Sequence, residues 1–217
     1  MRAKEAAGGT RTEEQAGIVD KQAAWDALKG RAAERLGPGM VFGEGPLDAR
    51  FVITGEAPGE QEAAAGRPFV GRAGQLLNRL LKEAGIDRAQ VYVTNVVKLR
   101  PTVEAGGRLK NRPPRAPEIK AGLEILLPEL EIVGPDALIL FGNVPAKALI
   151  GKAFAMGANR GVWFQSTAGL PALATYHPAY ILRLEGPDFD RTREVVVNDL
   201  IAARQALESP PEAKKLA

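Results

Sequence analysis

The chain has 217 residues, of which 45% are hydrophobic and 25% charged, and its formal net charge is +3. This composition predicts one globular domain with a sizeable core rather than a disordered chain. The absence of Cys and the presence of a single His exclude disulfides, thiolate nucleophiles, Cys-ligated metal centres and multi-His zinc sites. No apolar run reaches the about 18 residues that cross a membrane, and the N-terminus lacks a signal-peptide pattern. We therefore expect a cytoplasmic protein.

The sequence pattern predicts a single domain over residues 13–208, with flexible tails over 1–12 and 209–217. Apolar residues at three-to-four spacing predict an amphipathic helix over 13–36. After a Gly/Pro-rich turn, the pattern changes to short apolar runs that are typical of buried strands. These runs are 51–53, 91–93, 137–141 and 172–174.

Helical patterns lie between and after these runs, over 73–84, 118–133, 144–150 and 190–207. Strands that alternate with helices indicate parallel βαβ units and an α/β fold. In such a sheet, functional residues gather in the loops at the carboxyl ends of the strands.

Three polar side chains follow three of the predicted strands, namely Glu56, Asn95 and His177. A fixed Asn amide can read the donor and acceptor edge of a base, and a neutral imidazole can stabilise an anion on a leaving group. The alternatives are a turn-forming Asn and a structural His. Because all three follow strand ends, we expect them to share one pocket.

The loop after the first strand is rich in glycine, at positions 55, 59, 66, 71 and 74. Neither the dinucleotide spacing nor the P-loop spacing is present. The glycines therefore either shape a tight turn or let backbone N–H groups approach a ligand. Phe69 lies inside this loop, where it can fill the core or stack on a flat base.

The segment 98–115 carries six Lys or Arg residues against Glu104 alone. It is either a solvated surface loop or a loop that contacts phosphates. Phosphate contact is the better explanation of so local an excess. The candidate DNA-binding cations are Lys98, Arg100, Arg108, Lys110 and Arg112.

Taken together, these motifs resemble the family 4 uracil-DNA glycosylases, within the wider uracil-DNA glycosylase superfamily. The resemblance covers about residues 41–183 and rests on separated motifs in the family's order: Gly55-Glu56-Ala57-Pro58-Gly59, Gly66 to Leu77, Val91 to Lys98, Arg100-Pro101 and Tyr176-His177-Pro178-Ala179-Tyr180. It implies a three-layer α/β/α fold with a central four-stranded parallel sheet. It also implies base-excision repair by hydrolysis of the N-glycosidic bond of uracil in DNA, with uracil-containing DNA as partner and uracil as product.

The resemblance also implies roles for single residues. Phe69 would stack on the flipped uracil, Asn95 would pair with its edge, and His177 would face its O2 together with backbone N–H groups around Glu56 and Ala57. In the best-known branch of the superfamily an Asp stands at the position of Ala57. We therefore expect Glu56 to direct the water, with Glu60 and Glu62 behind it.

Family members usually hold a four-iron four-sulfur cluster on four cysteines. Here the corresponding places are Leu99, Gly122 and the region 32–36, and none offers a thiol. We therefore expect no cofactor, no metal and no cluster. Since the cluster is mainly structural in the family, its loss affects stability and DNA contacts more than the pocket.

The residues after His177 complete the expected DNA contacts. Tyr180, Ile181 and Leu182 would wedge into the space that the base vacates, with Arg183 beside them. Two alternatives to a uracil-DNA glycosylase remain: a glycosylase for another deaminated or mismatched base such as hypoxanthine, and a non-catalytic DNA-binding relative. We expect a monomer.

Overall fold

The computed structural model describes residues 9–209 and 211–216, with side chains described from residue 20 onward. Its first helix, α1 (Gly9–Leu36), begins earlier than the expected residue 13, and residues 1–8 of the expected N-terminal tail lie outside the described part. None of the described helices combines the length and the apolar character that crossing a membrane requires.

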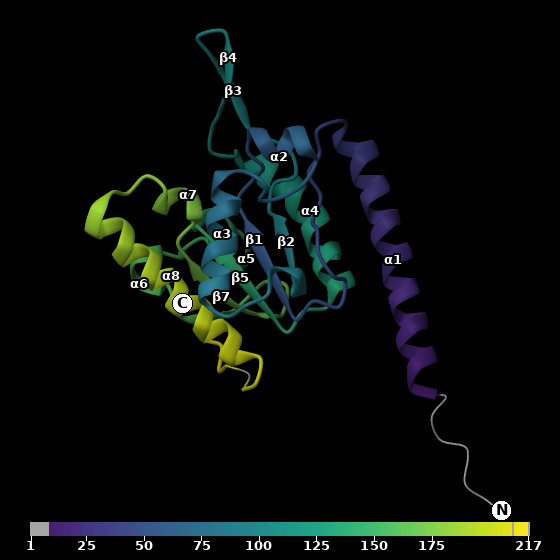
Figure 1. Cartoon of the computed structure of the whole chain (residues 1–217). Helices are drawn as coiled ribbons and strands as arrows, with labels where there is room; N and C mark the ends of the chain where they lie inside the picture. Colours follow the sequence, from purple (N-terminus) through teal and green to yellow (C-terminus); the bar gives the residue numbers. More distant parts are fainter. Residues whose placement is uncertain (1–8, 210, 217) are drawn as a thin grey trace, which may run out of the picture.

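The central sheet has five strands in the order β2-β1-β5-β7-β6 (Figure 1). The four strands expected from the sequence are all present and parallel: β1 (Phe51–Gly55), β2 (Val91–Asn95), β5 (Ala137–Phe141) and β7 (Pro171–Thr175). The expectation of four strands is corrected by β6 (Trp163–Gln165), which pairs antiparallel with β7 at the edge. Three residues are too few to give a strand pattern in the sequence.

Helices cover both faces of the sheet, as the three-layer fold requires. Alternate strand residues point to opposite faces, so that Val52 and Leu138 pack in one core cluster and Ile53 and Ile139 in the other. The first face is covered by α4 (Ala116–Val133) and α5 (Asn143–Leu149). The second face is covered by α3 (Arg72–Glu83), α7 (Pro178–Ile181) and α8 (Gly186–Ala206).

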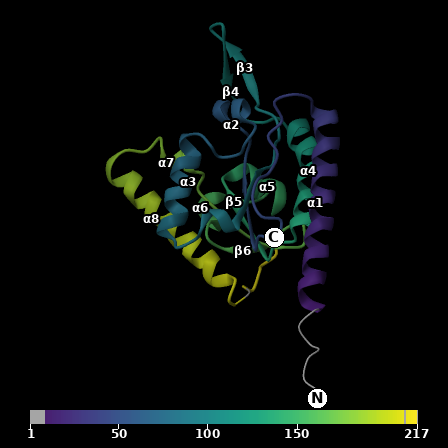
Figure 2. The ribbon, with the colours of Figure 1, turned by 45° about the vertical axis from the view of Figure 1, so that its right-hand side comes forward.

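Helix α1 adds an outer element, because it lies along α4 rather than on the sheet (Figure 2). Leu28 and Ala32 of α1 pack with Phe42 and Ile125 in a small apolar cluster of their own. The remaining short elements are α2 (Glu60–Ala65), η1 (Arg88–Gln90) and α6 (Met156–Asn159).

Two segments differ from the sequence-based expectation of irregular structure. Within the segment 98–115, which we expected to be a loop, residues 102–111 form a β-hairpin of β3 (Thr102–Ala105) and β4 (Arg108–Asn111). At the other end of the chain, within the expected flexible tail, Lys214 pairs with β6: its N–H donates to Trp163 O at 3.0 Å and its carbonyl accepts from Gln165 N–H at 2.8 Å. Leu216 then packs against the core cluster that contains Val52.

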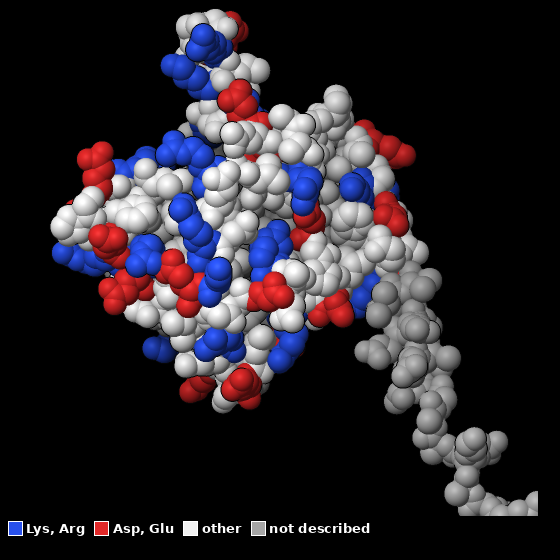
Figure 3. All heavy atoms as spheres, viewed as in Figure 1, with Lys and Arg blue, Asp and Glu red and all other residues white. Residues whose placement is uncertain are grey.

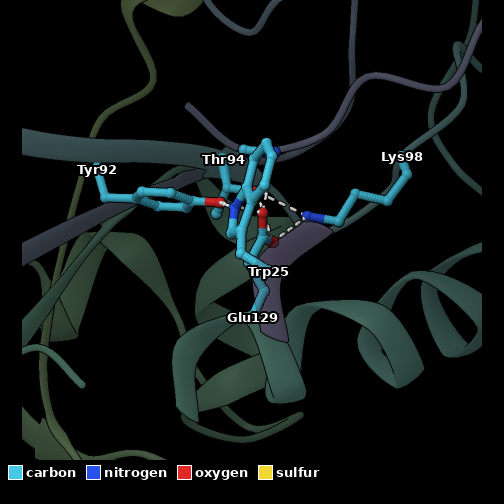
Figure 4. Close-up of polar contacts among 6 residues, drawn as sticks. Trp25, Tyr92, Thr94, Lys98 and Glu129 are labelled. Atoms are coloured by element: carbon cyan, nitrogen blue, oxygen red, sulfur yellow. Dashed lines mark hydrogen bonds and ion pairs between the residues drawn. The ribbon is translucent and has the colours of Figure 1, made fainter. Parts of the chain in front are cut away.

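A buried polar network joins β2, α4, α1 and the chain before β1 (Figure 4). The Glu129 carboxylate accepts hydrogen bonds at Oε1 from Tyr92 OH (2.7 Å) and Gly43 N–H (2.9 Å). At Oε2 it accepts from Thr94 Oγ1 (3.0 Å) and from Lys98 Nζ (2.5 Å). Every lone-pair direction of the carboxylate thus has a donor, which is what a buried charge requires.

The outer helix is tied into this network, since Trp25 Nε1–H of α1 donates to Tyr92 OH at 2.7 Å. Burial and the Glu129 charge raise the pKa of Tyr92, so its hydroxyl keeps the proton that it donates. Burial lowers the pKa of Lys98, whereas the neighbouring Glu129 charge raises it. With a side-chain exposure of 0% for both charges, the pair depends wholly on its internal partners.

We predict that Lys98→Met lowers the free energy of unfolding by about 3–5 kcal/mol, because it leaves the Glu129 charge buried without a counter-ion. Urea denaturation followed by circular dichroism measures this change. Lys110→Met, at an exposed lysine of β4, is the control and should leave stability nearly unchanged. Equal midpoints for the two variants would contradict the assigned role of the pair.

Candidate active site

A pocket of about 550 Å³ lies at the carboxyl ends of β1, β2 and β7. Glu56, Asn95 and His177, each expected from its position after a strand, all line it. Ala57 and Phe69 line it as well. The structure therefore brings together every residue for which the sequence predicted contact with the base or catalysis.

Gly55, the last residue of β1, makes room for two of these side chains. A Cβ atom at this position would lie 2.5 Å from Asn95 Oδ1 and 2.6 Å from Phe69 Cζ. Real side chains never approach so closely, so any residue other than glycine would displace the amide or the ring. At Gly55 the pocket's own side chains use the space that glycine leaves, which is neither a tight turn nor the approach of backbone N–H groups to a ligand.

Phe69 is held in an unusual backbone conformation. Its φ of 54° is the only positive value at a residue other than glycine among the described residues. Its carbonyl lies where a side chain of residue 74 would begin, 1.6 Å from the position of a Cβ, so only Gly74 fits there. The ring stacks with His177 at 6.0 Å between centroids and 30° between planes. Strain of this kind is typical of residues that are fixed for a function.

His177 follows β7 and caps α7. Its Nδ1 accepts a hydrogen bond from the Ala179 N–H at 3.1 Å. Burial, and then the charge of Arg183, lower the pKa of His177 to about 4. The imidazole is therefore neutral near pH 7, and with Nδ1 accepting, its proton is assigned to Nε2. This leaves one N–H donor for a ligand in the pocket.

Glu56, Glu60 and Glu62 all line the pocket, but they differ in burial and in their partners. Burial raises the pKa of Glu56, and the Arg183 charge opposes this shift. Glu62 is used within the fold, since it accepts from Gly59 N–H (3.1 Å) and Gly71 N–H (2.8 Å) and so closes the glycine-rich loop. Glu60 is exposed and lies 3.5 Å from the Arg100 guanidinium. Of the two carboxylates expected behind Glu56, Glu62 is therefore engaged by the backbone, whereas Glu60 stays a prediction.

The structure divides the expected DNA-binding cations. Lys98 is wholly buried against Glu129, so its assignment as a phosphate contact is wrong. Arg100 and Arg112 hold the base of the β3–β4 hairpin, Arg112 through two hydrogen bonds to Glu118 at 2.6 and 2.7 Å. Arg108 and Lys110 are exposed on β4.

The three residues of the expected wedge, 180–182, also differ in whether they reach the surface. Ile181 has an exposure of 0% and packs in the core with α3 and α8, so it is not a wedge. Leu182 is partly buried against the same cluster. Tyr180, 41% exposed, lines the pocket, with the exposed Arg183 guanidinium 5.8 Å from its ring. One turn of helix thus presents Tyr180 outward and Ile181 inward.

The places that correspond to cluster ligands do not fit an iron–sulfur cluster. The chain has no cysteine, and a Cβ at Gly122 would already lie 2.1 Å from Val96 O. The region 32–36 contributes Ala32 to the apolar cluster with Phe42. These places therefore offer no thiol ligand, and at Gly122 the packed backbone leaves no room for any side chain.

The sequence pointed to Gly55, Gly74 and Glu62 but not to what they do. Gly55 and Gly74 leave space for neighbouring groups, and Glu62 accepts hydrogen bonds from two glycines of the loop, and no local pattern shows these contacts. The hairpin did have a signal, because Gly106-Gly107 stands between two four-residue segments of mixed polarity, a typical type I′ turn sequence.

The fold and pocket define an α/β protein whose site lies at the carboxyl edge of a mostly parallel sheet. The model of the uracil DNA glycosylase superfamily matches residues 42–201, and the chain belongs to this superfamily. It is 40% identical over 166 residues to a type-4 uracil-DNA glycosylase of Thermotoga maritima, covering 76% of this chain and 81% of that protein.

Two further relatives carry the same name. The type-4 uracil-DNA glycosylase of Pyrobaculum aerophilum is 41% identical over 150 residues, which are 66% of this chain and 73% of that protein. The type-4 uracil-DNA glycosylase of Sulfurisphaera tokodaii is 37% identical over 174 residues, which are 72% of this chain and 74% of that protein.

We predict that Gly55→Ala lowers the rate of uracil release from DNA, the activity in the relatives' names, by about 100-fold. The added methyl group displaces Asn95 or Phe69, and a shift of about 1 Å in a site costs that much. Single-turnover assays with a uracil-containing oligonucleotide measure the rate. Gly157→Ala, where a Cβ meets nothing within 4 Å, is the control and should keep the parent's rate.

Proposed function

We propose that the chain is a uracil-DNA glycosylase that hydrolyses the N-glycosidic bond of uracil in DNA and leaves an abasic site. We propose that the reaction needs neither an iron–sulfur cluster nor another cofactor. The observation that carries the proposal is the convergence of Glu56, Phe69, Asn95 and His177 on one pocket. The superfamily match and the type-4 relatives support the same reaction.

Uracil must leave the base stack before the bond can be cleaved. In the pocket, Phe69 stacks on the flipped base, and the Asn95 amide pairs with its edge. In the described part of the chain the Asn95 amide has no hydrogen-bond partner, which leaves its donors and acceptor for a ligand. An amide that is fixed but unpaired is well suited to select one base by its edge.

Cleavage places negative charge on the departing uracil. The Nε2–H of the neutral His177 donates to uracil O2, and backbone N–H groups of Glu56 and Ala57 approach the same oxygen. Fixed donors of this kind stabilise charge as it develops and need no reorganisation. Because Ala179 occupies Nδ1, the ring cannot turn its acceptor toward the anion without losing that hydrogen bond.

The sugar becomes positively charged as the bond breaks. The Glu56 carboxylate positions the attacking water and faces the oxocarbenium-like sugar. Arg183, Tyr180 and Leu182 contact the DNA around the flipped nucleotide, with the apolar parts occupying the vacated space. Arg183 also favours the ionised state of Glu56, because its charge opposes the effect of burial on that pKa.

The test is base release from matched oligonucleotides that contain uracil, hypoxanthine or a mismatched thymine. We expect release of uracil, and a loss of about 10²–10³ in rate for His177→Ala, in line with the removal of one such donor. Asn95→Ala should lose activity on uracil as well. Release of hypoxanthine but not uracil, or DNA binding with no release, would contradict the proposal.

The pH dependence of the single-turnover rate separates the two catalytic groups. Glu56 must be ionised, so the rate falls as the pH drops through its pKa, which burial raises above 4.5. His177 stays neutral down to about pH 4. We therefore expect the Glu56→Gln variant to release uracil slowly. Its rate should not fall as the pH drops through the range in which Glu56 of the parent becomes protonated. If the rate of the Glu56→Gln variant still fell near pH 6.5, the titrating group would instead be His177.

A further inference from the structure

The β3–β4 hairpin projects from the body of the protein (Figures 1 and 2). Its last residue, Asn111, lines the pocket. Its two strands pair with each other and, in the described part of the chain, with no other strand. At the tip, Gly106 and Gly107 have φ values of 66° and 70°, and a Cβ at either would meet nothing within 4 Å. The hairpin therefore ends in open space.

The base of the hairpin is fixed to the pocket wall. The Arg100 Nε–H donates to Asn111 Oδ1 at 2.7 Å, and the Arg112 Nε–H donates to Thr102 O at 2.9 Å. Arg112 is itself held by Glu118 of α4. Because Asn111 and Arg112 also line the pocket, the direction of the hairpin is set relative to the site.

The two faces of the hairpin differ in charge. In the strand register Val103 lies opposite Lys110 and Ala105 opposite Arg108, so that one face carries both cations. Glu104 lies on the other face, opposite Leu109. Within the described residues, neither Arg108 nor Lys110 has an ion-pair partner. Figure 3 shows cationic side chains at the end of the projection.

The hairpin also exposes apolar surface that the protein does not cover. Val103 is 47% exposed and Leu109 is 60% exposed. A two-stranded ribbon that packs on no sheet or helix is only marginally stable by itself. The projecting hairpin therefore indicates a surface that contacts a partner. A cationic ribbon next to a site that takes a nucleotide fits DNA, since cations attract its phosphates and a two-stranded ribbon fits its major groove.

On the basis of the proposed function, we propose that the β3–β4 hairpin is a DNA-binding arm that holds duplex DNA beside the flipped nucleotide, through the face that carries Arg108 and Lys110. Four residues at about 3.3 Å each give a reach of about 13 Å. At about 3.4 Å per base pair, this distance corresponds to about four base pairs. The arm thus contacts the flank of the site rather than the base.

Two variants test the arm without disturbing the pocket. The first is Arg108→Ala/Lys110→Ala. The second replaces residues 103–110 by Asn-Gly, which keeps the Thr102 and Asn111 pair and its contacts with Arg100 and Arg112. The control is Arg79→Ala/Lys82→Ala, which removes one exposed Arg and one exposed Lys near the far end of α3. Binding to uracil-free duplex is measured by fluorescence anisotropy at several salt concentrations.

We expect the slope of log K against log salt to fall by about 2 in both arm variants, since each lost phosphate contact contributes about 0.9. Affinity at about 100 mM salt should fall by about tenfold, and the control should match the parent. For uracil-containing duplexes, KM should rise while the single-turnover rate at saturation stays within twofold. With flanks of about two base pairs, parent and variants should become equal.

A parent-like slope in both arm variants would overturn the proposal, as would a loss that is equally large on short flanks. This outcome is distinct from failure of the proposed function. If the parent released no uracil but the slope still fell in the arm variants, the glycosylase proposal would fail and the arm would stand as a DNA contact.

Discussion

The rest of the fold depends on the hydrogen bonds that the buried Glu129 carboxylate accepts. It takes four hydrogen bonds in the interior, from β2, from the chain before β1 and from Lys98, and through Tyr92 it reaches the outer helix α1. Removing any donor leaves part of a buried charge unsatisfied. The network lies next to Leu99 and on the same helix as Gly122, where the resemblance implies cluster ligands. In this region of the chain, side-chain hydrogen bonds and the apolar cluster around Phe42 thus hold the elements together.

This scaffold also supports the pocket. Directly after β2, Val96 and Val97 donate to the carbonyls of Gly55 and Glu56 at 2.9 and 3.0 Å, and Val41 N–H donates to Lys98 O at 2.8 Å. The segment that Lys98 anchors therefore also holds the backbone of Glu56. Glu62 fixes the glycine-rich loop on the other side. Asn95 and Phe69 are confined by close packing at Gly55, and His177 by the hydrogen bond from Ala179 N–H.

Much of the fold and of the pocket was predictable because both follow from local patterns. The apolar runs identify the four parallel strands, and parallel topology alone places Glu56, Asn95 and His177 at one edge. What failed depends on partners far away in the sequence. Lys98 stands among surface cations, and only Glu129 in α4 shows that it is buried. Ile181 is adjacent to the exposed Tyr180, and packing against α3 and α8 decides which of the two turns inward.

On the proposed function, this chain's own side chains and backbone form a complete uracil-releasing pocket. The most direct measurement is single-turnover release of uracil from a duplex oligonucleotide, by protein treated with EDTA and analysed for iron. Rapid release by iron-free protein is the predicted result. Release that requires added iron, or no release from a protein shown to be folded, would contradict the account.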